Sequence, residues 1–300
     1  MAKYIVNMMN EKIDMENRVP VIAPKVHPIT EDAFAPCENT TVYWLGGGGF
    51  MVNTRGTILL IDPILETFEK EGSLYAANGH ILLQPFPMET KDVKKCDMLL
   101  FTHDDGDHAN PETVKILANQ DVPMLGSARV FETLVKQGIK PDHYTVCHAG
   151  ETYTVGEIEI EILPGDHPWQ LIDGGRCFYP EDCVGFIVKS VDGTIVFTGD
   201  TRLMKEHIGI PNVVLLPLDV SACVFHLGRS AAALLANKYP DAYILPYHYG
   251  TFDYPECPAQ EGGDPQLVLQ NVNNADKRGL VVGPGCPVTI CNGKLVRGDE

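Results

Sequence analysis

The stretch LLFTHDDGDHAN, residues 99–110, joins an apolar strand-like run to a dense group of acidic and imidazole side chains. The apolar run ends at Thr102, and the chain then places five such side chains within six positions: His103, Asp104, Asp105, Asp107 and His108. Carboxylates and imidazoles this close repel or desolvate one another unless a positive charge lies among them. The stretch therefore indicates a bound cation at the end of a buried strand.

Three further strand-like segments end in the same kinds of side chain. EIEILPGDH ends at Asp166 and His167, TIVFTGDT contains Asp200, and AYILPYHYG contains His248. A single Asp or His at a strand end is usually a turn former or a helix cap. Four such ends at one sheet edge can instead direct several ligands to one point, as a pair of divalent ions about 3.5–4 Å apart requires.

The order of elements predicts an α/β fold. Strand patterns come first, at residues 41–45, 49–54 and 57–63, and strands later alternate with helical patterns such as residues 128–138 and 228–240. This order favours two mixed sheets packed face to face with helices outside. We expect residues 1–36 to form an N-terminal extension, residues 37–300 to form one domain, and residues 64–95 to be a loop-like insertion.

Composition excludes several classes of function. The formal net charge of −17 opposes a polyanionic partner, and the basic residues are scattered except for Lys94 and Lys95, so we expect no nucleic-acid binding. No apolar stretch approaches the roughly 20 residues of a membrane-spanning helix, so no membrane association is expected. The nine cysteines form no C-x-x-C motif, which favours reduced thiols in a cytoplasmic protein.

The chain resembles the metallo-β-lactamase superfamily over about residues 40–255. The superfamily signature, H-x-H-x-D-H followed by distant His, Asp and His, matches HDDGDH and the three later segments. YWLGGGGFMV, TILLIDP, FTGDT, HLGRSAAALL and ILPYHYGTFD are most similar to the branch that contains the ascorbate-6-phosphate lactonase and related metal-dependent hydrolases. The resemblance implies a four-layer αββα sandwich, and the branch also suggests a homo-oligomer.

The resemblance also implies a set of metal ligands. His103, Asp105 and His167 would hold one ion, Asp107, His108 and His248 would hold the other, and Asp200 would bridge the two. Asp105 replaces the second His of the signature, and this extra hard oxygen shifts the expected metal from zinc toward manganese or iron. With Asp107, Asp200 and a hydroxide, Asp105 would make a two-ion centre formally neutral.

Two points in this ligand set stay open. Asp105 could fail to reach the centre, which would leave a single metal at Asp107, His108 and His248. Gly47 stands where many relatives of the branch have a His, so that corner of the site is either open or filled by another group.

The implied chemistry is hydrolysis. A bound metal lowers the pKa of water from 15.7 to about 7, so that a hydroxide can attack a carbonyl carbon or a phosphorus. Asp200 would take part in catalysis as the bridging ligand. Two other residues could protonate the leaving group: Asp107, if it is loosely bound, and His226, which is alternatively a structural histidine at a helix start.

Loops at the strand ends should select the substrate. The candidate substrate-binding residues are Trp169, Arg176, Tyr179, Arg202 and Tyr249. Arg176 and Arg202 could meet an anionic group, whereas the aromatic residues could equally serve ordinary packing. A small polar ester, such as a sugar lactone with or without a phosphate, fits this set better than a polymer.

Three alternatives remain from the sequence. The same metals could serve a phosphodiesterase or nuclease, although no basic face is apparent. An acid at the position of Asp105 also occurs in relatives that handle oxygen with two irons. A binding protein without metal is the third alternative.

Other acidic residues and histidines are assigned structural roles. We expect Asp62 to bond backbone near the site, Asp104 to form a turn or cap a helix, and Asp166 either to bind metal or to orient His167. The remaining histidines are expected at the surface or in turns: His27, His80, His143, His148 and His207.

Overall fold

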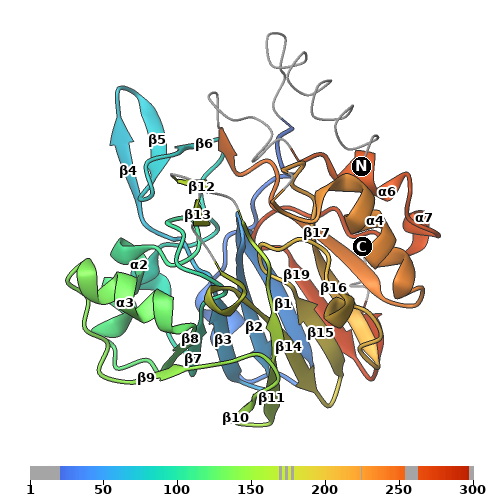
Figure 1. The fold of residues 1–300 in the computed structure, drawn as a ribbon, viewed down its shortest axis with the longest axis horizontal. Helices are drawn as coiled ribbons and strands as arrows, with labels where there is room; N and C mark the ends of the chain where they lie inside the picture. The colour runs from blue at the N-terminus through green and yellow to red at the C-terminus, as the bar shows by residue number, and fades with distance from the viewer. Residues whose placement is uncertain are drawn as a thin grey trace.

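The computed structural model describes residues 21–168, 171–172, 175–176, 179–223, 225–253 and 263–296. Two large sheets form the centre of this part of the chain (Figure 1). The first has eight strands in the order β20-β19-β1-β2-β3-β7-β8-β9, and the second has six in the order β10-β11-β14-β15-β16-β17. The first comprises β1 (Thr40–Gly46), β2 (Gly49–Thr54), β3 (Thr57–Ile61), β7 (Met98–Leu100), β8 (Met124–Gly126), β9 (Tyr144–Val146), β19 (Pro287–Cys291) and β20 (Lys294–Val296). The second comprises β10 (Thr152–Val155), β11 (Ile158–Pro164), β14 (Val184–Ser190), β15 (Gly193–Phe197), β16 (Val213–Asp219) and β17 (Tyr243–Tyr247).

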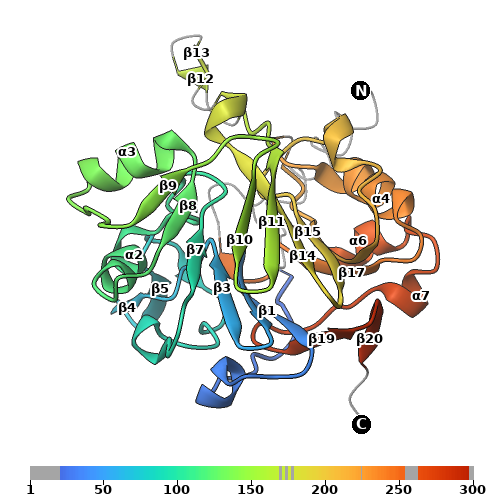
Figure 2. The same cartoon turned by 90° about the horizontal axis from the view of Figure 1, so that it is seen from below.

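Both sheets are mixed, and helices cover their outer faces. In the first sheet, β1, β2 and β3 pair antiparallel, and β3, β7, β8 and β9 run parallel. In the second sheet, β10, β11, β14 and β15 pair antiparallel, and β15, β16 and β17 run parallel. Parallel neighbours need crossover connections, and α-helices supply those from β7 to β8, from β8 to β9 and from β16 to β17. Figure 2 shows α2 (Pro111–Ala118) and α3 (Ala128–Lys136) outside the first sheet, and α4 (Gly228–Lys238), α6 (Pro265–Leu269) and α7 (Ala275–Arg278) outside the second. The predicted αββα sandwich is confirmed.

Strand β3 shows how the layers are held together. Leu59 and Ile61 pack in the cluster between the two sheets, and Ile58 and Leu60 pack in the cluster under α2 and α3. Side chains alternate between the two faces of a strand, so a continuous apolar run is what a strand buried on both faces requires. This is why TILLI lies in the interior of the sandwich.

The prediction of a loop-like insertion at residues 64–95 is wrong. This segment contains β4 (Thr67–Lys70), β5 (Ser73–Ala76), β6 (Ile81–Leu82) and the short 3-10 helix η3 (Thr90–Asp92). The three strands join β18 (Phe252–Asp253) in a small sheet of order β18-β6-β5-β4. All four residues of β4 are exposed, so no alternation of apolar and polar residues marked it as a strand.

Part of the predicted N-terminal extension packs against the domain. Phe34, in the 3-10 helix η2 (Glu31–Phe34), is buried, and Asn53 Nδ2 donates to the carbonyls of Ala33 and Ala35 at 2.8 and 2.9 Å. Residues 1–20 lie outside the described residues, and the boundary at residue 36 stays a prediction.

The cysteines and the helices add two findings. The seven cysteines within the described ranges are free thiols: Cys37, Cys96, Cys147, Cys183, Cys223, Cys286 and Cys291. Among the helices described, none has the length and apolar character needed to cross a bilayer.

Candidate metal centre

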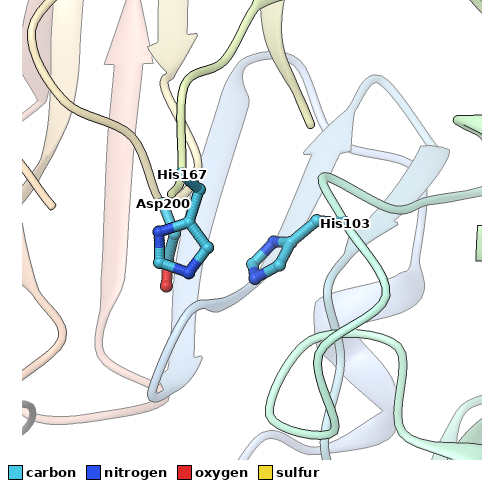
Figure 3. A group of neighbouring side chains, drawn as sticks. All are labelled: His103, His167 and Asp200. Carbon is cyan, nitrogen blue, oxygen red and sulfur yellow. The ribbon is translucent and has the colours of Figure 1, made fainter. Parts of the chain in front are cut away.

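The four strand ends singled out in the sequence meet at one place. His103 follows β7, His167 follows β11, Asp200 follows β15 and His248 follows β17, and each of these side chains is buried. The donor atoms of His103, His167 and Asp200 all lie within 4.8 Å of one another, and Figure 3 shows their side chains turned toward a common point. The donors of Asp107, His108 and His248 form a second group of the same size.

Asp200 lies at the middle of this arrangement. Its Oδ2 is 3.2 Å from His108 Nε2, and its Oδ1 is 3.1 Å from His248 Nε2. Burial opposes the charge on Asp200, but the imidazoles of His108, His226 and His248 outweigh it and hold the pKa of the carboxyl well below its usual range. A carboxylate with imidazoles at both oxygens suits the bridging position that the resemblance implies.

The residues present fit a bound cation. Within the described part of the chain, Asp200 Oδ1 and His108 Nε2 are buried and make no hydrogen bond of normal geometry, despite their close contacts. Buried polar atoms are nearly always satisfied, so such atoms call for an explanation such as an ion. Imidazole nitrogens and carboxylate oxygens are the donors that zinc, manganese and iron accept.

Asp105 reaches the centre. Its Oδ2 lies 3.4 Å from His103 Nε2 and 3.6 Å from His167 Nε2. Burial would raise the pKa of this carboxyl, but hydrogen bonds and charge interactions with the two imidazoles lower it below its usual range. The Asp105 carboxylate thus lies beside two imidazoles of the centre, and its role as a metal ligand stays a prediction.

Three of the imidazoles are oriented through their other nitrogen. His108 Nδ1 lies 2.9 Å from Asp62 Oδ2, and His167 Nδ1 lies 3.1 Å from the carbonyl of Phe225. His103 Nδ1 lies 3.0 Å from Thr102 Oγ1. Partners of this kind fix the ring and direct Nε2 toward a metal.

The electrostatics favour cations. Burial would lower the pKa of His108, but the carboxylates of Asp200 and Asp62 outweigh it and raise this pKa well above its usual value. The carboxylates that favour a proton on this imidazole also favour a metal cation in its place. Burial lowers the pKa of His167, which favours the neutral form that a ligand needs.

Sequence reasoning found only half of the role of Asp62. As expected, it bonds backbone, since Thr102 N donates to its Oδ1 at 2.8 Å. It also holds His108, which was not foreseen. Asp219 was missed altogether, although it closes the strand VVLLPLD and lies 2.7 Å from His226 Nδ1. Its place at a strand end is the same signal that pointed to the other residues.

The corner near Gly47 is filled. A Cβ at Gly47 would lie 2.9 Å from the Phe252 ring, so no space is open there. The next residue, Gly48, is the one against the imidazoles: a Cβ there would lie 2.4 Å from His108 Cε1 and 3.1 Å from His248 Nε2. His248 itself has the left-handed φ of 61°, a conformation that costs energy and often occurs at functional sites.

The candidate substrate residues have diverse positions. Trp169 and the side chain of Arg176, in the short strand β13 (Gly175–Arg176), lie outside the described part. Tyr179 is 53% exposed. Arg202 is half-exposed, and its Nε donates to Asp166 Oδ2 at 2.9 Å, so Asp166 pairs with this arginine.

Tyr249 belongs to the core. Its side chain is 1% exposed and its ring stacks on Trp44 with the ring centroids 5.2 Å apart. The ring therefore packs in the core, where a substrate cannot reach it, and the prediction that Tyr249 binds substrate is wrong.

Two residues assigned to turns or the surface have other surroundings. Asp104 accepts from Arg129 Nε at 3.0 Å and from Thr133 Oγ1 at 2.6 Å, which ties it to α3. His207 is fully buried in the 3-10 turn η5 (Lys205–His207), and its Nε2 lies 3.0 Å from the Pro164 carbonyl. His27, His143 and His148 are exposed as expected, and His80 is half-buried.

Comparison with known proteins agrees with the fold. The model of the beta-lactamase superfamily domain matches residues 57–249. A UPF0173 metal-dependent hydrolase of Methanopyrus kandleri is 28% identical over 217 residues, which is 70% of this chain and 84% of the relative. Another, of Herpetosiphon aurantiacus, is 26% identical over 253 residues, or 81% of this chain and 94% of the relative.

A solved structure shares the architecture. Igni18, a metallo hydrolase from the archaeon Ignicoccus hospitalis, superposes with a TM-score of 0.61 at 19% identity, covering 84% of this chain and 98% of its own. This likeness concerns the fold, whereas the domain match spans all four strand ends that form the centre. The chain belongs to the beta-lactamase superfamily.

Proposed function

We propose that this protein is a metal-dependent hydrolase that holds two divalent cations and cleaves a small polar ester, specifically a lactone. The observation that carries the proposal is the buried Asp200 carboxylate, with imidazoles from three separate parts of the chain within 3.4 Å of its oxygens. The similarity to metal-dependent hydrolases supports the same reaction class.

The ligands divide into two groups around Asp200. His103, Asp105 and His167 would hold one cation, and Asp107, His108 and His248 the other, with manganese, zinc or iron suited to these donors. When bound, such cations lower the pKa of a water molecule and stabilise negative charge that develops on a carbonyl oxygen.

The other polar groups of the chain orient these ligands and handle the proton. Asp62 fixes the His108 ring by its contact with Nδ1, so that the ring cannot turn its other nitrogen away. Asp107 is partly exposed, whereas His108 and His248 are buried. Asp107, like Asp105, is therefore open enough for a leaving group to reach it. We assign Asp107 to take the proton that the attacking water loses and to pass it to the leaving oxygen.

Two arginines of the described part of the chain, Arg202 and Arg129, favour an uncharged ester over a phosphorylated one. Arg202 is paired with Asp166, and Arg129 is paired with Asp104. A phosphate group would have to draw one of these cations from its partner, in a chain whose net charge is already −17. A sugar lactone without phosphate meets no such cost.

Metal analysis and a substrate panel test the proposal. Protein purified without added metal should contain manganese, zinc or iron. It should hydrolyse neutral sugar lactones faster than their phosphorylated forms or bis(p-nitrophenyl) phosphate. Asp200→Asn should lose both metal and turnover.

The matched control is Asp192→Asn. Asp192 is also a buried aspartate, but it accepts from Thr40 Oγ1 at the β14–β15 turn, away from the centre. A metal-loaded protein that cleaves only the phosphodiester, or that only consumes oxygen when loaded with ferrous iron, would replace the lactone with one of those alternatives. Absence of metal uptake would remove the proposal entirely.

A further inference from the structure

His226 is a buried imidazole in the centre that the family signature does not include. Its Nε2 lies 3.4 Å from Asp200 Oδ2, and the donors of Asp200, His226 and His248 all lie within 4.8 Å of one another. We propose that His226 is a metal ligand that binds, through Nε2, the same cation as His248. This inference rests on the proposed function and adds a donor that the family signature does not include.

The orientation of the His226 ring is fixed by a buried carboxylate. Asp219 is fully buried, and its Oδ2 lies 2.7 Å from His226 Nδ1. Its other oxygen accepts from Ser221 N at 2.8 Å, so the carboxylate itself cannot rotate freely. Nδ1 is thereby occupied, and Nε2 is the nitrogen directed at Asp200.

The same arrangement occurs at a residue that the signature does include. Asp62 lies 2.9 Å from His108 Nδ1, and His108 Nε2 lies 3.2 Å from the same Asp200 Oδ2. A carboxylate–histidine pair aimed at a common acceptor is typical of metal ligands. His226 and His108 thus approach Asp200 Oδ2 with equivalent support.

The surroundings of His226 do not suit a helix-start histidine. The residue at the N-cap of α4 is Leu227, and no side chain caps this helix end. The His226 ring lies instead among other imidazoles, with its centroid 5.1 Å from that of His167 and 5.3 Å from that of His248. Its side chain is only 3% exposed, and Nε2 faces Asp200 and not the solvent from which a substrate would enter.

One nitrogen can bind one cation only, which defines what His226 adds. His248 belongs both to the group with Asp107 and His108 and to the group with Asp200 and His226. Whichever cation takes His248 Nε2 therefore has His226 within reach as an additional ligand. That cation should be bound more tightly than the cation in the other site, whose ligands are signature residues alone.

Metal binding measured directly tests the inference. Metal-free protein would be titrated with Mn²⁺ and Zn²⁺ against a competing chelator, and Co²⁺-loaded protein would be examined by visible absorption. His226→Asn should weaken one of the two binding events by at least about 100-fold and alter the Co²⁺ spectrum. Asp219→Asn keeps the ring and loses only its charged support, so it should weaken the same event by about 10–100-fold.

The controls separate this inference from the proposed function. His207→Asn removes a histidine that is equally buried but lies outside the centre, and it should leave both affinities unchanged. Thermal unfolding in chelator shows whether each variant is folded, and Asp219→Asn preserves the test if His226→Asn does not fold. Unchanged stoichiometry, affinities and Co²⁺ spectrum in His226→Asn would overturn the inference, whereas a wild-type protein that binds no cation would overturn the proposed function.

Discussion

Gly48→Ala should disable one half of the metal centre by adding a single methyl group. Gly48 lies in the turn between β1 and β2, and its φ is not left-handed, so the backbone itself accepts alanine. The added Cβ would stand 2.4 Å from His108 Cε1, whereas ordinary contacts begin at about 3.4 Å. The ring or the turn must therefore move by about 1 Å.

The His108 ring has no free direction in which to move. It lies between Asp62 at 2.9 Å and Asp200 at 3.2 Å, and a 1 Å shift breaks at least one of these contacts. Metal–ligand distances tolerate only about 0.2 Å, and disturbing the groups that orient a ligand costs about 10–100-fold in metal affinity. We expect the affinity of the site with Asp107, His108 and His248 to fall by about 100-fold, or about 2.7 kcal/mol.

Chelator competition on metal-free protein measures this loss. The matched control is Gly106→Ala, in the loop that carries His103 and His108, where a Cβ would meet only Asn78 Cβ, at 3.8 Å. That variant should bind both cations normally. If Gly48→Ala bound both cations with wild-type affinity, the assignment of His108 as a ligand in its observed position would be refuted.

Three further perturbations have defined outcomes. Arg129 contacts Asp104, the neighbour of Asp105, at 3.0 Å and Asp182 at 3.3 Å, and Asp182 in turn accepts from Tyr179 N. Arg129 therefore positions Tyr179 relative to the centre, and Arg129→Met should raise KM by roughly tenfold with metal content unchanged. A fall in kcat alone would contradict this positioning role. Burial lowers the pKa of His207 from its usual 6.5, so this residue stays neutral in the fold while the unfolded chain takes up a proton as the pH falls below that value. His207→Gln should therefore lose less free energy of unfolding than wild type between about pH 7 and pH 5, as urea titrations can measure, and equal losses would refute the role of its burial. Chelator should lower the Tm by several degrees, because a cation present at about 100 times its Kd adds about 2.7 kcal/mol to folding, and an unchanged Tm would mean that cations do not bind the folded state.

Local rules in the sequence were enough to predict most of the sandwich. The segment NPETVKILANQ, residues 110–120, carries the local signals of a helix start, and α2 begins there with Pro111 in its first turn and Thr113 N donating to Asn110 Oδ1 at 3.0 Å. The small sheet at residues 64–95 is only partly local: β4 and β5 form a hairpin, whereas β6 pairs with β18 through Leu82 and Phe252, which are far apart in the chain. Pairing of that kind depends on the completed tertiary structure.

The same distinction holds for the metal centre. Strand ends mark the candidate ligands, but the carboxylates that orient them depend on register. Ile61 pairs with Leu100 in parallel strands, which brings the following Asp62 beside Thr102 and His108. Likewise Asp219 pairs with Tyr247, the neighbour of His248. Asp62 and Asp219 also stand at strand ends, but the sequence alone does not show which imidazole each of them contacts.

The supporting carboxylates change the charge of the centre and thereby the expected substrate. The sequence suggested a neutral core, but Asp62 and Asp219 add two buried negative charges to those of Asp105, Asp107 and Asp200. Two divalent cations then leave one negative charge even before a hydroxide forms. At about 5 Å and an effective dielectric constant of about 20, each further negative charge on a substrate costs about 3 kcal/mol, or about 100-fold in affinity. Because Arg202 and Arg129 already pair with aspartates, the centre should discriminate against a phosphorylated lactone by about that factor for each phosphate charge.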